Sequence, residues 1–124
     1  MTDERNEAVL RVVPRLRDIN ANGHIFGGWV LSQMDIAGGI VAHRIAHGAV
    51  ATVAIEGMKF ISPILLGDIV SVYATEERRG RTSVAIRIEV IATRGIAQEQ
   101  VPVTSGVYTF VALDANHKPR PLPV

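Results

Sequence analysis

The sequence contains no cysteine, which excludes disulfides, thiolate chemistry and cysteine-based metal sites. Aromatic residues make up only 5% of the 124 residues, against 48% for all hydrophobic types, so we expect a mainly aliphatic core. Neither sign of charge dominates, because 13 Lys and Arg stand against 12 Asp and Glu, a net charge of +1. Without a strong overall field to recruit polyanions, we expect neither nucleic acid nor a membrane as a partner.

A long uninterrupted hydrophobic run is also missing. The most apolar window, residues 25–42, contains Gln33, Asp35 and four glycines, which argues against a membrane span. The first seven residues are polar and acidic, unlike the basic and then apolar start of a signal peptide. We therefore expect a single soluble domain, residues 1–124, located in the cytoplasm.

What is present is one helical stretch and several strand-like runs. Residues 8–13 predict a short strand ended by Pro14, and residues from about 28 to about 47 predict a long helix that stops before Gly48. Four further runs predict strands joined by hairpin-length links: 50–61, 69–77, 81–93 and 101–113. This order predicts an α+β domain in which an antiparallel sheet curls around one long central helix.

Two of the predicted strands differ in their patterns. The run 81–93 alternates, with one apolar face made of Val84, Ile86, Ile88 and Val90, as in a half-buried strand. The run 101–113 is apolar on both faces, which predicts a second interface between copies of the chain.

The predicted helix is apolar nearly all round, so we expect it to be buried as a central element. Gly38 and Gly39 in its middle each cost roughly 1 kcal/mol against alanine. They predict close packing against a neighbouring backbone, for which we take the helix of a second copy.

The stretch from Gly23 to Asp35 combines a glycine pair with a carboxylate. Gly27 and Gly28 lie at the start of the helix, where the N–H groups have no intrahelical acceptor and the dipole favours negative charge. Asp35 lies among apolar residues, and a carboxylate in such surroundings is either paired or functional. The structural alternatives are tight helix–strand packing for the glycines and acceptance of hydrogen bonds from a turn for Asp35.

Seven residues separate Gly28 from Asp35, which places them on one helix face roughly 10 Å apart along the axis. That is too far for both to contact one reacting carbon, where distances near 3 Å are needed. Either the two parts serve different functions, or two antiparallel copies of the helix bring the glycine end of one beside Asp35 of the other. We favour the second interpretation, which makes the protein an obligate dimer.

These residues resemble a known family. The run from Asn20 to Trp29, NANGHIFGGW, followed by Ser32-Gln33-Met34-Asp35, closely resembles the hotdog-fold acyl-CoA thioesterases, particularly their YciA-like branch. The likeness extends to Phe60-Ile61-Ser62-Pro63, Gly67-Asp68, Arg81-Thr82-Ser83 and Thr109-Phe110-Val111-Ala112, and covers about residues 9–123. A glycine pair before a helix is weak evidence by itself, whereas this ordered set is specific.

The resemblance implies an enzyme that hydrolyses acyl-CoA thioesters to coenzyme A and a carboxylic acid. It implies the hotdog fold, homodimers with shared active sites and a trimer of dimers. It implies no cofactor, since coenzyme A is part of the substrate, and we expect no bound metal. His43 and His47 are one helical turn apart, but the residues between them, Arg44-Ile45-Ala46, supply no zinc-site glutamate.

The resemblance also assigns roles to residues. Asp35 aligns with the catalytic acid, as a general base or a nucleophile, and the N–H groups of Gly27 and Gly28 polarise the thioester carbonyl. An asparagine in the preceding loop positions the thioester or water, for which we choose Asn20 first and Asn22 second. The remaining residues assigned to substrate binding are His24, Phe26, Lys59, Arg81, Thr82 and Ser83, of which Arg81, Thr82 and Ser83 approach the nucleotide.

Two other functions stay open at this stage. A hotdog enoyl hydratase or dehydratase needs a His–acid pair, and His24 is the only histidine in the stretch from Gly23 to Asp35. A non-catalytic acyl-CoA sensor needs the pocket without a base, whereas Asp35 is present. Thiol release from acyl-CoA, tight binding without release, and addition of water to an enoyl substrate distinguish the three.

Overall fold

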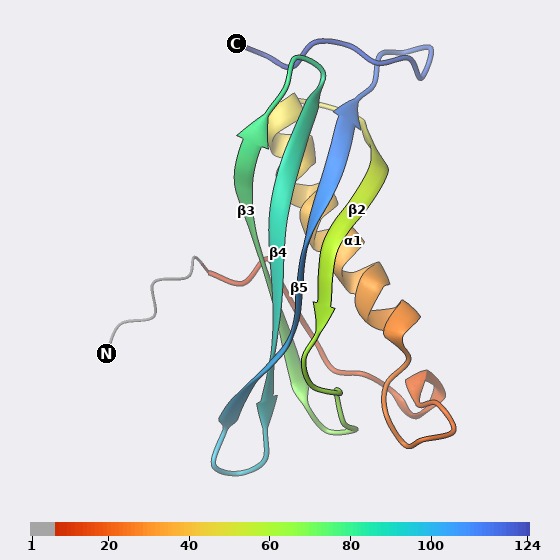
Figure 1. Cartoon of the computed structure of the whole chain (residues 1–124), viewed down its shortest axis with the longest axis vertical. Helices are drawn as coiled ribbons and strands as arrows, with labels where there is room; N and C mark the ends of the chain where they lie inside the picture. The colour runs from red at the N-terminus through yellow and green to blue at the C-terminus, as the bar shows by residue number, and fades with distance from the viewer. Residues whose placement is uncertain (1–6) are drawn as a thin grey trace.

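One long helix lies against one face of a five-stranded sheet in the computed structural model, which describes residues 7–124 (Figure 1). The helix is α1 (Gly27–Ala46), and a short 3-10 helix, η1 (Leu16–Asp18), precedes it. The strands are β1 (Leu10–Val12), β2 (Val50–Phe60), β3 (Ile69–Arg79), β4 (Ser83–Arg94) and β5 (Glu99–Ala112). Every paired strand is antiparallel, in the order β1-β3-β4-β5-β2, so the predicted α+β architecture of an antiparallel sheet with one long helix is confirmed.

The core lies between α1 and the sheet. The helix buries one stripe with roughly helical spacing: Val30, Met34, Ala37, Gly38, Ala42 and Ala46. The predicted alternation in β4 is confirmed, since Val84, Ile86, Ile88 and Val90 are all at most 1% exposed. On β5, Tyr108 and Phe110 complete this layer. The few aromatic residues of the core therefore sit beside small helix residues, where their bulk fills the space.

The prediction that α1 is buried all round is wrong for the single chain. Asp35, Ile36, His43 and Arg44 are exposed on the face opposite the sheet. A single sheet covers a helix from one side only, so the other side stays open unless another molecule covers it. Among residues 7–124, no helix combines the length and apolar character needed to cross a membrane.

The glycines in the middle of α1 pack differently from the prediction. A Cβ atom on Gly38 would lie 2.7 Å from Ile88 Cδ1 and 3.0 Å from the Phe110 ring. Gly38 therefore allows a close approach to side chains of the chain's own sheet, and the expected contact with a second helix is wrong for this residue. A Cβ on Gly39 would meet only Phe110, at 3.9 Å, which is ordinary contact.

The C-terminal end of α1 is fixed by a distant residue. The helix ends at Ala46, one residue before the predicted end, and His47 adopts a left-handed conformation with φ of 57°. Arg120 donates a hydrogen bond of 2.8 Å to the Ala46 carbonyl and another of 2.9 Å to the Leu113 carbonyl. A cation at this position satisfies free carbonyls at the negative end of the helix dipole.

Of the two edge strands, the short β1 and the 11-residue β2, β2 leaves the long side of the sheet open. It pairs with β5 only, and its apolar residues Val53 and Ile55 are 58% and 46% exposed. A long, apolar edge strand is a template for pairing with another chain. On β5, Val107 and Val111 on the outer face are half-buried within the protomer.

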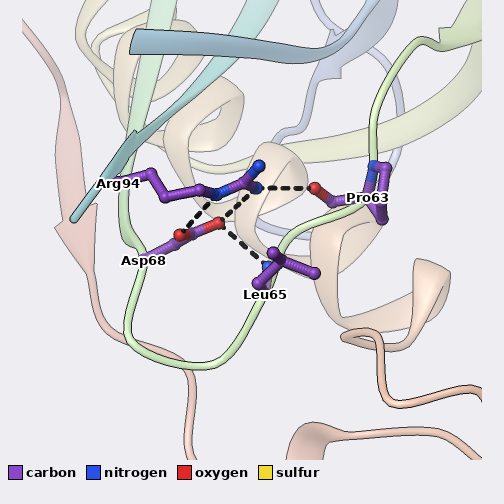
Figure 2. Close-up of polar contacts among 4 residues, drawn as sticks. All are labelled: Pro63, Leu65, Asp68 and Arg94. Atoms are coloured by element: carbon purple, nitrogen blue, oxygen red, sulfur yellow. Dashed lines mark hydrogen bonds and ion pairs between the residues drawn. The ribbon is translucent and has the colours of Figure 1, made fainter. Parts of the chain in front are cut away.

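A buried ion pair fixes the loop between β2 and β3. Figure 2 shows the Asp68 carboxylate, only 2% exposed, facing the guanidinium of Arg94 from the end of β4. Arg94 donates two hydrogen bonds to Asp68, of 3.0 and 2.8 Å, and a third to the Pro63 carbonyl. The Leu65 N–H donates a further hydrogen bond, of 2.9 Å, to the Asp68 carboxylate. Asp68 therefore has a structural role in the Gly67-Asp68 turn.

Candidate active site

Asp35 lies on the open face of α1, and its carboxylate is held by the edge strand. Thr52 on β2 donates a hydrogen bond of 2.5 Å to Asp35 Oδ1. The contact fixes one carboxylate oxygen and leaves Oδ2 with no hydrogen bond among the described residues. Sequence reasoning missed Thr52, because seventeen positions separate it from Asp35 and threonine is ordinary in a strand.

A hydrogen bond from the sheet anchors the helical turn that precedes Asp35. Tyr108 on β5 is fully buried, and its hydroxyl donates a hydrogen bond of 2.9 Å to the Leu31 carbonyl. Burial, with a smaller contribution from the negative charge of Asp35, raises the pKa of Tyr108 to about 12. Tyr108 therefore remains a neutral donor at physiological pH and holds this turn of α1 on the sheet.

Gly27 and Gly28 are the first two residues of α1 and face open space. Phe26 is the N-cap, and its carbonyl accepts hydrogen bonds from the Trp29 and Val30 N–H groups. The Gly27 and Gly28 N–H groups have no acceptor within the described chain, and a Cβ added to either residue meets no atom within 4 Å. The alternative that the pair permits tight packing within this chain is therefore wrong.

Asn20 organises the loop before the helix. Its side-chain oxygen accepts hydrogen bonds from the Asn22 and His24 N–H groups, at 2.9 and 3.1 Å. Its own N–H donates to the His24 carbonyl at 2.6 Å. Asn20 thus has the turn-forming role considered for it. Its side-chain amide nitrogen makes no hydrogen bond to the described part of the chain. Asn22 is exposed and His24 is half-buried.

In the basic hairpin between β3 and β4, one guanidinium has no ion-pair partner among residues 7–124. Arg78 pairs with Glu77 and Glu56, and Arg79 pairs with Glu76. Arg81 forms no ion pair with the described residues. The backbone of this hairpin is fixed, since the Arg81 and Thr82 carbonyls accept hydrogen bonds from the Leu122 and Ala112 N–H groups. The available charge therefore belongs to Arg81, on a rigid support that also carries Thr82 and Ser83.

Within one protomer these groups are spread out. The hairpin lies beside the C-terminal end of α1, and the glycine pair lies at the other end of the helix, which is about 30 Å long (Figure 1). Asp35 lies between them, roughly 10 Å along the axis from Gly28. Lys59 is exposed near the end of β2. One chain therefore does not bring Asp35 and the glycine N–H groups onto a single reacting carbon.

A hollow of about 420 Å³ extends along the open face of α1 from Asp35. Its lining residues are Asp35, Ile36, Gly39, Ile40, His43 and Arg44. The walls are mostly apolar, and the two ends carry charged or polar groups. All of these residues belong to α1, so the hollow is shallow and open to solvent in the single chain and needs a second surface to enclose a ligand.

Comparison with known proteins supplies independent evidence. A family model described as the thioesterase superfamily matches residues 22–97. The acyl-CoA thioester hydrolase YciA of Salmonella typhimurium is 49% identical, over 97% of this chain and 92% of that protein. The structure of a hexameric thioesterase from Yersinia pestis gives a TM-score of 0.92 at 44% identity, covering 99% of both chains. A hexameric hotdog-fold thioesterase of Campylobacter jejuni gives 0.91 at 34% identity, covering 98% of this chain and 93% of that one.

Proposed function

This chain belongs to the thioesterase superfamily, and from that premise we propose that it hydrolyses acyl-CoA thioesters to free coenzyme A and a carboxylic acid. The observation that carries the proposal is the exposed Asp35 carboxylate, hydrogen-bonded by Thr52 of the open edge strand and facing an apolar hollow. A fixed carboxylate beside a space for an acyl group is what hydrolysis of an activated acyl bond requires. No resident cofactor takes part in the proposed reaction.

The site is completed by a second copy of the chain. Asp35 is held by the strand whose outer side is unpaired, so it lies where a second β2 would join the sheet. The two helices then run antiparallel across a two-fold axis. If Gly28 of the partner subunit lies beside Asp35, each step forward along one helix is a step back along the other. The residue numbers of two facing helical positions therefore sum to about 63. The open space around the glycine pair is consistent with this arrangement.

In this composite site each group has a defined task. The N–H groups of Gly27 and Gly28 of the partner subunit bind the thioester oxygen and stabilise the negative charge that develops there. Asp35 Oδ2 accepts a proton from water while the water oxygen attacks the carbonyl carbon. The C–S bond then breaks, and the proton on Asp35 returns to the departing coenzyme A sulfur. The side-chain amide nitrogen of Asn20 of the partner subunit, from the loop before the same glycine pair, orients the thioester or the water.

A second route uses the same groups. Asp35 Oδ2 attacks the carbonyl carbon directly, coenzyme A leaves as a thiolate that takes a proton from solvent, and water hydrolyses the resulting anhydride. Single turnover in oxygen-18 water distinguishes the routes, because only attack on the aspartyl carbon of the anhydride places the label in Asp35. The free guanidinium of Arg81, with Thr82 and Ser83, contacts the coenzyme A phosphates. By analogy with the hexameric relatives, three dimers assemble into a hexamer.

Mixing two inactive variants tests the shared site. Asp35→Asn removes the base, and Gly28→Val places a side chain over the N–H groups. In a mixed dimer one site has both defects and the other has none, so random exchange restores about a quarter of wild-type thiol release. A site made by a single protomer gives no recovery, because each chain in the mixture keeps one defect. Unimpaired turnover by Asp35→Asn alone removes Asp35 from the mechanism.

A further inference from the structure

The hollow on the open face of α1 is not explained by the reacting groups alone. Only Asp35, at one end, belongs to the proposed chemistry, while Ile36, Gly39 and Ile40 form an apolar floor that leads away from it. His43 and Arg44 lie at the other end. The hollow therefore has a reactive end, an apolar middle and a basic end, arranged along one helix.

Gly39 leaves space that the fold of the protomer does not need. A methyl group there makes only an ordinary contact with Phe110, at 3.9 Å, whereas one on Gly38 collides with the sheet. Glycine within a helix costs about 1 kcal/mol relative to alanine. Packing explains that cost for Gly38 but not for Gly39, whose missing side chain instead enlarges the hollow.

We propose that this hollow holds the acyl chain of the substrate and that Gly39 sets its depth, which gives the enzyme a preference for medium-length chains. This inference rests on the proposed function. His43 lies eight positions after Asp35, about 12 Å along the helix, which is roughly the length of an extended chain of eight to ten carbons. A longer chain meets the imidazole of His43 and the exposed guanidinium of Arg44, where apolar carbon gains little from burial.

The partner subunit supplies the outer wall. With facing positions that sum to about 63, the start of the partner helix at Phe26 and Gly27 lies over Ile36. Phe26 is 48% exposed in the single chain, so its ring is available to cover an apolar chain.

Substitution of Gly39 tests the depth of the pocket. We expect Gly39→Leu to lower the ratio of kcat/KM for octanoyl-CoA to that for acetyl-CoA about tenfold, and Gly39→Ala to lower it less. Ala97→Leu in the exposed β4–β5 turn is the control and leaves the ratio unchanged. Equal ratios in wild type and both Gly39 variants, or losses that are uniform over all chain lengths in both, overturn the proposal.

The basic end is tested in the opposite direction. Arg44→Leu replaces the charge with apolar surface, so kcat/KM for dodecanoyl-CoA relative to octanoyl-CoA should rise several-fold. An unchanged ratio contradicts the proposed limit on chain length.

Calorimetry with unreactive S-octyl-CoA and S-ethyl-CoA thioethers measures binding without depending on hydrolysis. If wild type releases no thiol, the proposed function fails, while a selective loss of S-octyl-CoA affinity in Gly39→Leu still supports the pocket and an unselective result rejects it.

Discussion

At the scale of single residues, the contact between Thr52 and Asp35 links the helix to the open edge of the sheet. A donated hydrogen bond at 2.5 Å fixes the carboxylate direction without neutralising its charge. Thr52 touches the candidate base and not the reacting atoms, so we regard it as a positioning residue.

Thr52→Val should therefore lower kcat about 10- to 100-fold with little change in KM, because a misdirected carboxylate loses its alignment with the reacting carbon. Thr52→Ser keeps the hydroxyl and should restore most of the rate. The measurement is steady-state thiol release with both variants, alongside thermal unfolding. A loss of rate in Thr52→Ser as large as in Thr52→Val would show that the hydroxyl is not what matters.

The ion pair of Asp68 and Arg94 predicts a pH dependence of stability. Burial alone would raise the pKa of Asp68, but the hydrogen bonds from Arg94 and the Leu65 N–H, with the Arg94 charge, hold that pKa below its ordinary value of 3.8. A depressed pKa in the folded state means that the stabilisation is complete above the unfolded pKa and is lost as pH falls through the folded one. The pair should therefore stabilise the protein at neutral pH and fail only in acid.

Asp68→Asn should lower the free energy of unfolding by about 3 kcal/mol at pH 7, since it leaves a partly buried guanidinium without its counter-charge. The difference from wild type should shrink as pH falls below about 4. Urea unfolding at a series of pH values measures both effects. Glu76→Gln breaks the exposed pair with Arg79 and is the matched control, with an expected change of at most about 1 kcal/mol.

At the scale of elements, α1 uses two adjacent glycines for opposite reasons. Gly38 faces the sheet and Gly39 faces the hollow, because consecutive helical residues are about 100° apart around the axis. One residue lets the helix approach β4 and β5, and the other leaves room on the outer side.

Gly38→Ala should lower the free energy of unfolding by about 1–3 kcal/mol, because the added methyl displaces Ile88 and Phe110. Gly39→Ala should be neutral or raise it by up to about 1 kcal/mol, since it gains helix propensity without a clash. Denaturant unfolding of the two variants side by side measures the difference. Equal effects of the two substitutions would contradict the assignment of the two faces.

At the scale of the whole molecule, the edge strand β2 connects assembly to activity in the proposed dimer. It presents Val53 and Ile55 to solvent and carries the Thr52 side chain that holds Asp35. In the proposed dimer, a second copy closes this edge, hides the apolar side chains and brings a second glycine pair to the carboxylate.

Val53→Lys places a charge at this edge and should dissociate the dimer, with loss of thiol release in proportion to the dissociated fraction. Sedimentation velocity and activity, measured over the same range of protein concentration, test the connection. Ile96→Lys in the fully exposed β4–β5 turn adds the same charge away from the edge and should change neither. A monomeric Val53→Lys variant with full activity would contradict the shared site.

The sequence alone determined the elements of this protein and its family resemblance. Helix and strand periods repeat over a few residues, so the long helix, the four long strands and the buried face of β4 were all predictable. The glycine pair, Asp35 and the preceding loop form one contiguous stretch, so this candidate site was visible before any contact was known.

Only the tertiary structure decided what surrounds that stretch. Thr52 reaches Asp35 because β2 pairs with β5 under the helix, a consequence of strand order that no local pattern contains. The same packing turned Gly38 inward and Gly39 outward and left one helix face open. It also paired Arg78 and Arg79 with glutamates but left Arg81 without an ion pair to the described residues. Local periodicity specifies which residues share a face, whereas long-range packing decides what each face meets.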